Sequence, residues 1–254
     1  MITPIFSCSL QEGILAEDVK VTGEIRPHDT APGAPALQPL GLPQVGTTPR
    51  AWIRKYFPEI AFWIGVIAAI YFWVTVTIDA QINPWWGFFQ SSFSALGDPS
   101  PNSTGAAAGL YWFYNDVVIF PTGTMIIVFS LGMAMGARNW IQSVGSSFFA
   151  VAGIFLIMVG IFHGGPPTPA GYHDFVSNWF FVQSLFAILV WSFGILAERR
   201  WLLGFGMLAL GIAAPLIGYS IHWPSVATTE AFGIAAIDLW LFLMFFGRKA
   251  PPKA

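Results

Sequence analysis

Six long apolar runs alternate with short polar or Gly- and Pro-rich breaks along most of the chain. A hydrocarbon core of ~30 Å is crossed by about 20 mainly apolar residues in helical conformation. Each run has close to that length, so each predicts one membrane-spanning helix. The predicted spans cover residues 59–79, 110–135, 140–162, 175–197, 201–221 and 229–246. The pattern therefore predicts an all-α fold, a six-transmembrane-helix bundle.

The two ends of the chain and one connection lack this pattern. Residues 1–50 are rich in Pro and scattered acids and predict a mobile, disordered N-terminal tail. Residues 51–249 form the predicted six-span membrane domain, and residues 250–254 form a short C-terminal tail. The connection 82–109 is too polar to span, yet its Pro-Trp-Trp-Gly-Phe-Phe stretch is too apolar for open solvent. We therefore expect an interfacial or re-entrant first outer loop.

The amino-acid composition indicates the environment of the chain and excludes one class of partner. Hydrophobic residues make up 55% of the 254 residues and charged residues 9%, a balance typical of a chain in lipid. The formal net charge of -2 provides no basic field for nucleic acid, which is excluded as a partner. Cys8 is the single cysteine, so we expect no internal disulfide and no iron–sulfur cluster held by cysteines alone.

The positions of the basic residues predict an orientation. Lys and Arg lie before the first span, between the second and third, between the fourth and fifth, and after the sixth. The other three connections contain no Lys or Arg. Because basic residues accumulate on the cytoplasmic side of membrane proteins, we expect a multi-pass protein of the cell membrane with both termini in the cytoplasm.

Polar and ionisable residues gather on the opposite, predicted outer side. They stand near the ends of different spans, where such groups turn toward protein or water rather than acyl chains. We therefore expect them to face a shared polar chamber beneath the first outer loop. The candidate residues for this chamber or for a ligand are Ser94, Asp116, His173, Asp174 and Glu230.

Asp238 is a further candidate at a different depth. It lies about eight residues into the sixth predicted span, or ~12 Å below its outer end at a helical rise of ~1.5 Å per residue. A carboxyl group there should face the bundle interior, be protonated or have a donor at its own depth. Gln183 is the predicted donor, with the hydroxyls of Thr122 or Thr124 as additions. The pattern leaves open a proton or ligand site and a single interhelical hydrogen bond.

Two groups of short motifs resemble a known family. The first is Phe93-Ser94-Ala95-Leu96-Gly97 followed by Trp112-Phe113-Tyr114-Asn115. The second is Gly160-Ile161-Phe162 followed by Tyr172-His173-Asp174-Phe175, with Phe180-Phe181, Glu230 and Trp240 later in the chain. Over residues 59–247 this order resembles the membrane proteins of domain-of-unknown-function family 998. The layout is also similar to that of six-span FRAG and DRAM type membrane proteins, some of which are linked to lipid remodelling or sorting. Because the family has no assigned reaction, the resemblance implies a membrane bundle without supplying an activity.

Three functions fit these residues. The first is a lipid-associated protein or an accessory, structural subunit of a membrane complex, with membrane lipids and other membrane subunits as partners. The second is a metal-dependent or lipid-modifying hydrolase with an outer-face His and Asp site, its metal held by His163, His173 and His222. The third is a haem-binding respiratory subunit, in which two histidines ligate the iron. The sequence assigns no catalytic residue and no cofactor, and we favour the first function.

Overall fold

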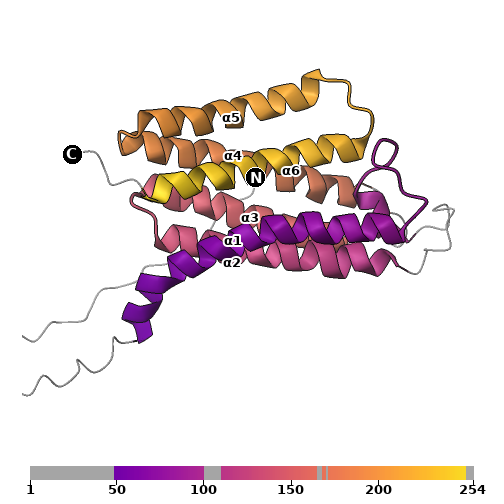
Figure 1. Cartoon of the computed structure of the whole chain (residues 1–254), viewed down its shortest axis with the longest axis horizontal. Helices are drawn as coiled ribbons and strands as arrows, with labels where there is room; N and C mark the ends of the chain where they lie inside the picture. The colour runs from indigo at the N-terminus through magenta and orange to yellow at the C-terminus, as the bar shows by residue number, and fades with distance from the viewer. Residues whose placement is uncertain (1–48, 100–109, 165–167, 170, 250–254) are drawn as a thin grey trace, which may run out of the picture. The chain divides into compact units, whose positions relative to one another are not determined.

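A computed structural model describes residues 49–99, 110–164, 168–169 and 171–249. The predicted N-terminal and C-terminal tails lie outside these residues, apart from residues 49 and 50, which begin the first helix. The helical elements are α1 (Pro49–Ile82), the short 3-10 helix η1 (Ser94–Gly97), the π-helical segment η2 (Phe113–Ile119), α2 (Phe120–Met135), α3 (Trp140–Ile161), α4 (Tyr172–Ala197), α5 (Trp201–Ser220) and α6 (Val226–Lys249) (Figure 1).

Among the described residues, six helical segments are long and apolar enough to cross a membrane, with η2 and α2 forming one continuous span. The same residues contain no β-strand. The predicted all-α fold and six-transmembrane-helix bundle are therefore confirmed, and the chain is a multi-pass membrane protein. α1 begins at Pro49, well before the predicted start at residue 59, because its helix continues through polar and basic residues beyond the apolar run.

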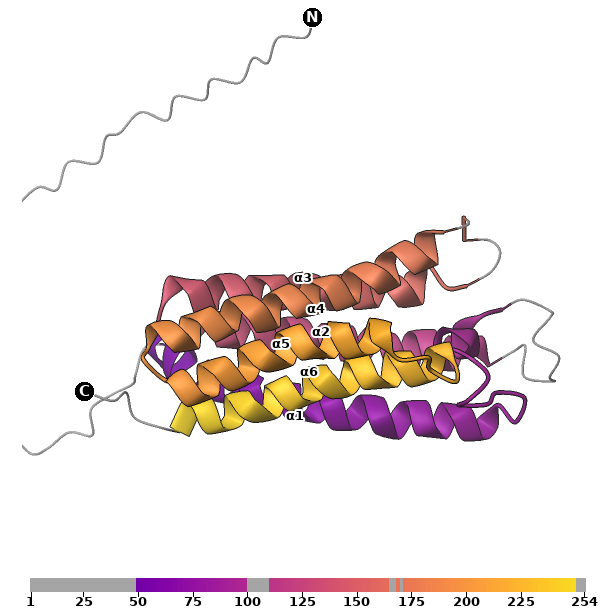
Figure 2. The same ribbon diagram turned by 90° about the horizontal axis from the view of Figure 1, so that it is seen from above.

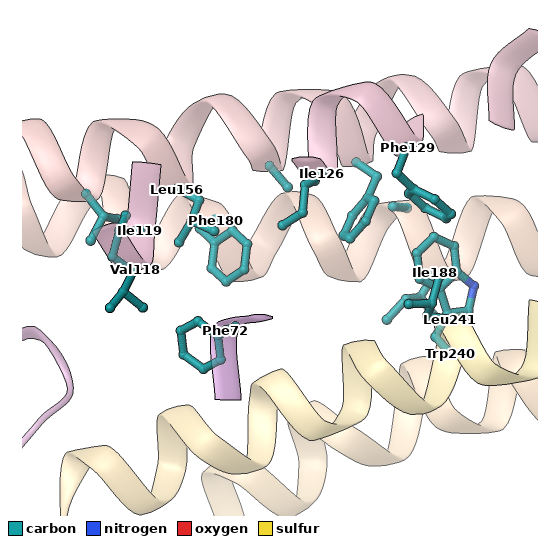
Figure 3. Packing of buried hydrophobic residues seen from close by; sticks show 14 of the residues in the cluster. Phe72, Val118, Ile119, Ile126, Phe129, Leu156, Phe180, Ile188, Trp240 and Leu241 are labelled. Atoms are coloured by element: carbon teal, nitrogen blue, oxygen red, sulfur yellow. The ribbon is translucent and has the colours of Figure 1, made fainter. Parts of the chain in front are cut away.

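Helices that follow one another in the sequence pack together, and small residues permit their close approach (Figure 2). A Cβ atom added to Gly132 on α2 would lie 2.0 Å from the Cβ atom of Ala61 on α1. One added to Gly145 on α3 would lie 3.0 Å from the backbone nitrogen of Trp191 on α4. Such contacts matter in lipid because no hydrophobic effect drives the helices together. Large apolar side chains from different helices pack together in the core (Figure 3).

α5 has no buried residue after Gly211, which lies at the middle of the helix. Its buried residues are Gly204, Met207 and Gly211, and a Cβ atom added to Gly218 would meet no atom within 4 Å. Figures 1 and 2 show α4 and α5 diverging from their shared turn. This divergence accompanies a cavity between α4, α5 and α6.

The described part of the first loop, residues 83–99, packs against the bundle. The backbone nitrogen of Ala227 in α6 donates a hydrogen bond to the carbonyl oxygen of Ser91 at 2.9 Å. The Phe93 ring is 4% exposed and stacks on the ring of Trp86 at a centroid distance of 5.7 Å. This segment therefore does not span the membrane, and its contacts hold it beside the start of α6.

Candidate functional site

The two ends of the bundle carry different side chains. The histidine end contains the C-terminal ends of α1, α3 and α5 and the N-terminal ends of η2, α4 and α6. The arginine end contains the α2–α3 and α4–α5 turns, with Arg138, Arg199 and Arg200. A cavity of about 870 Å³, here named the chamber, lies between α4, α5 and α6 toward the histidine end and is also lined by the first loop.

The chamber has a polar part and an apolar part. The polar lining comes from the start of α4, the end of α5, the start of α6 and the first loop: Ser92, Ser94, His173, Asp174, Ser177, Asn178, Tyr219, Thr229 and Glu230. Further along the helices the lining is almost entirely apolar: Phe181, Val182, Leu185, Ile188, Gly211, Ala214, Pro215, Phe232, Gly233, Ala236 and Ile237. The chamber is therefore amphipathic along the helix axes.

Glu230 joins the chamber to the first loop. Its carboxylate oxygen Oε2 accepts a hydrogen bond from the backbone nitrogen of Phe93 at 2.7 Å. The hydroxyls of Ser92 and Ser94 lie 2.9 Å apart, and the Ser92 hydroxyl also accepts from the backbone nitrogen of Ala95 at 3.1 Å. These bonds fix a carboxylate and two hydroxyls at the polar part of the chamber.

His173 is held at the chamber by the end of α3. Its ring nitrogen Nδ1 lies 2.7 Å from the carbonyl oxygen of Phe162. Because a carbonyl oxygen only accepts, this nitrogen carries a proton, which leaves Nε2 as an acceptor in the neutral ring. Nε2 lies 3.5 Å from the hydroxyl of Ser177. The imidazole can therefore accept a hydrogen bond from a molecule in the chamber.

The structure brings together four of the six predicted ligand or polar-cluster residues. Ser94, His173, Asp174 and Glu230 all line the chamber. Asp116 does not line it, because η2 turns this side chain outward and leaves it exposed. The shared chamber therefore draws its acids from α4 and α6, and not from η2.

The three histidines do not gather in one place. The Nδ1 atom of His163 lies 3.2 Å from the carbonyl oxygen of Gly164, and the His163 ring lies against the ring of Tyr111 at a centroid distance of 6.0 Å. His222 is exposed in the connection between α5 and α6, whereas His173 lines the chamber. Within the described parts of the chain, no group of three His, Cys, Asp or Glu side chains is placed to hold a metal ion. The three histidines therefore supply no common metal site.

Asp238 has a donor at its own depth, but from an unexpected helix. The indole nitrogen Nε1 of Trp73 on α1 donates a hydrogen bond to Asp238 Oδ2 at 2.8 Å. The predicted donors were wrong: the hydroxyls of Thr122 and Thr124 donate to carbonyl oxygens of their own helix at 2.6 and 2.9 Å. Gln183 has a side-chain oxygen without a partner among the described residues. Asp238 is absent from the chamber lining and borders a separate cavity of about 60 Å³.

Asp79 is a buried carboxyl group at the predicted outer side that was not among the predicted ligand candidates. Its side chain is 0% exposed, and the Asn83 amide donates to its Oδ1 atom at 2.9 Å. The other oxygen, Oδ2, has no partner within the described residues. The sequence did contain a signal for this pair: an acid and an amide four residues apart lie on the same face of a helix and can form a hydrogen bond. This pair lies at the end of α1 and outside the chamber lining.

Comparison with known proteins finds one matching protein family. A family model described as "Protein of unknown function (DUF998)" matches residues 66–247, which is most of the chain. No curated protein and no solved structure matches. The similarity in layout to FRAG and DRAM type proteins and the haem-binding function therefore stay predictions.

Proposed function

The chain belongs to the DUF998 family, whose description assigns no activity, and we propose from the chamber that it binds a membrane lipid. The lipid headgroup lies among the polar residues, and an acyl chain lies along the apolar part. The observation that carries this proposal is the separation of polar and apolar lining along the helix axes. A water-soluble substrate would not need the apolar part, and a pure hydrocarbon would not need the polar part.

The dimensions of the chamber support a lipid ligand. Along α4 the lining extends from His173 to Ile188, which corresponds to about 22 Å at a helical rise of ~1.5 Å per residue. This length exceeds half of a hydrocarbon core of ~30 Å. The volume of about 870 Å³ lies within the range of roughly 300–1,000 Å³ that small-molecule sites occupy. An acyl chain therefore fits in both length and volume.

Charge selects the kind of headgroup. The described lining contains the carboxyl groups of Asp174 and Glu230 and no Lys or Arg. His173 presents a ring nitrogen that accepts a hydrogen bond. Because the polar part is rich in acceptors, it suits a headgroup that donates hydrogen bonds, such as an amine or a set of hydroxyls.

The direct test compares two glycines of α5. An added Cβ atom would meet no atom within 4 Å at either Gly218 or Gly206, but only Gly218 lines the chamber. Gly218→Trp places a large ring in the chamber beside its polar part, where the lipid enters the space between the helices, and the overpacking should lower retained lipid at least about fivefold. Gly206→Trp should retain the wild-type amount. The lipid that copurifies in a mild non-ionic detergent is extracted and quantified by mass spectrometry. Equal lipid content in the two variants would overturn the proposal.

Orientation completes the proposal: both termini lie in the cytoplasm, and the lipid comes from the outer leaflet. The distribution of Lys and Arg supports this orientation. In a Cys8→Ser background, a cysteine at Thr168 should react with a membrane-impermeant thiol reagent on intact cells. A cysteine at Lys249 should react only after permeabilisation, and Cys8→Ser alone should stay unlabelled. The opposite accessibility of the two positions would place the chamber toward the inner leaflet.

A further inference from the structure

A second cavity lies at the arginine end, with a lining separate from that of the chamber. Its volume is about 250 Å³, and its polar lining is formed by Arg138, Gln142, Glu198 and Arg200. An apolar wall that includes Trp191 completes it. The polar residues come from the α2–α3 turn, the start of α3 and the α4–α5 turn. No residue of the chamber lining belongs to this cavity.

One carboxylate organises the polar lining. Glu198 Oε2 lies 3.2 Å from Arg138 Nη1 and 4.0 Å from Arg200 Nη1. The other oxygen of Glu198, Oε1, accepts a hydrogen bond from the side-chain amide of Gln142. The side chains of Glu198 and Arg200 are only 11% and 10% exposed. Both guanidinium groups are therefore positioned at the cavity by contacts with a single acid.

The described lining holds more basic than acidic side chains. Two guanidinium groups, those of Arg138 and Arg200, and one carboxylate, that of Glu198, line the cavity. Burial lowers the pKa of the Arg200 guanidinium, the Glu198 carboxylate opposes that shift, and Arg138 adds to it. A bound anion would relieve both the burial of Arg200 and the repulsion from Arg138. The planar guanidinium fork is also the side chain best matched to phosphate oxygens.

We propose that the cavity lined by Arg138, Gln142, Glu198 and Arg200 binds a phosphate group. The phosphate belongs either to an anionic phospholipid or to a phosphorylated solute, and the two sources share the same recognition by the arginines. The apolar wall beside Trp191 gives room for the glycerol or acyl part of a lipid. In the proposed orientation this cavity faces the cytoplasm, so the protein binds a donor-rich headgroup at one membrane face and a phosphate at the other.

The test uses substitutions that change the charge of the cavity in opposite directions. Arg200→Gln removes one positive charge and a hydrogen-bond donor to phosphate, and should weaken binding about tenfold or more. Glu198→Gln keeps an oxygen for the Gln142 amide but removes the negative charge, and should strengthen binding several-fold. A cluster of purely structural ion pairs predicts no gain for Glu198→Gln. Arg54→Gln, at an exposed position of α1, is the matched control and should bind as the wild type does.

Binding is measured by titration calorimetry on the full-length protein in a non-ionic detergent, with dioctanoyl phosphatidic acid and inorganic phosphate as probes. Dioctanoylglycerol, which lacks the phosphate, is the lipid control. Binding of phosphatidic acid alone supports a lipid source, and binding of inorganic phosphate supports a free phosphorylated ligand. The thermal unfolding midpoint confirms that each variant folds. Glu198→Ala, which also removes the negative charge, replaces Glu198→Gln should that variant not fold, and it should likewise strengthen binding. Absence of binding by both probes, or binding unchanged by Arg200→Gln, would overturn the proposal.

Discussion

Removal of the Trp73 indole should destabilise the bundle in a way that depends on Asp238. Trp73 Nε1 donates to Asp238 Oδ2 at 2.8 Å and connects the first membrane helix to the last. Trp73→Phe keeps a ring against the neighbouring rings of Phe72 and Phe93, whose centroids lie 5.4 and 6.4 Å away. It removes the N–H group, so the carboxyl group of Asp238 loses its donor inside the bundle.

The expected coupling free energy between Trp73 and Asp238 follows from the position of their hydrogen bond inside the membrane. Interhelical hydrogen bonds in membranes contribute about 0.6 kcal/mol on average and up to about 1.7 kcal/mol. A buried acceptor left without a donor costs about 1–3 kcal/mol. The smaller ring also loses packing, but that loss occurs equally with and without the carboxyl group and cancels in a double-mutant cycle. Trp73→Phe and Asp238→Leu should therefore show a coupling free energy of about 1 kcal/mol.

The assay is reversible unfolding by sodium dodecyl sulfate in mixed micelles, followed by circular dichroism. The double variant should be more stable than the sum of the two single losses predicts, because it leaves neither a lone donor nor a lone acceptor. Trp63→Phe is the matched control: its indole donates to Glu59 on the same helix at 3.1 Å in an exposed position. That variant should change the free energy of unfolding little. Additive losses for Trp73→Phe and Asp238→Leu would refute the hydrogen bond as a stabilising contact.

Three further outcomes test the packing, the first loop and the role of the mid-membrane acid. In the same unfolding assay, Gly132→Ala should destabilise the bundle by about 1–3 kcal/mol, because the added methyl group overpacks against α1. Gly206→Ala is the control and should not destabilise the bundle, because a Cβ atom there meets open space. Glu230→Ala should speed hydrogen exchange of the Phe93 amide about tenfold, equivalent to ~1.4 kcal/mol for a lost bond to a carboxylate. Glu230→Gln retains an acceptor oxygen and should leave that exchange close to the wild-type rate. Asp238 lies outside the chamber lining, so Asp238→Asn should leave the amount of copurifying lipid, measured by mass spectrometry, unchanged. Loss of the lipid from a stably folded Asp238→Asn variant would instead make this residue part of the site.

The spans could be predicted because membrane thickness sets the length of an apolar run. About 20 residues are needed whatever the helix packs against, so hydropathy alone finds the six helices. Hydropathy does not find their ends, since backbone hydrogen bonding continues into polar residues: α1 begins at Pro49 and α6 at Val226. The described part of the first loop, residues 83–99, was placed correctly outside the spans, because its Asn, Pro and Ser residues interrupt any apolar run of sufficient length.

For the polar part of the chamber, the sequence predicted the depth in the membrane but not which residues face inward. Ser94, His173 and Glu230 stand near helix ends at one side, and ionisable groups there turn toward protein or water. Asp116 stands at a similar place in the sequence but is exposed, because η2 is π-helical and its wider turn changes which residues face inward. The apolar part was not predicted, since it arises from the divergence of α4 and α5, which no residue pattern encodes locally.

Depth and direction are separate properties of a residue in a membrane helix. Residue number fixes depth through the helical rise, and on that basis Gln183 and Asp238 were paired. Direction depends on rotation about the helix axis and on the neighbour found there, and the donor that reaches Asp238 comes from Trp73, 165 positions earlier in the chain. The long indole ring lets α1 supply this donor across the bundle. A mid-membrane acid in a sequence therefore implies a partner at its own depth without identifying the helix that provides it. With Asp238 engaged by Trp73 and absent from the chamber lining, the acids available to a ligand there are Asp174 and Glu230.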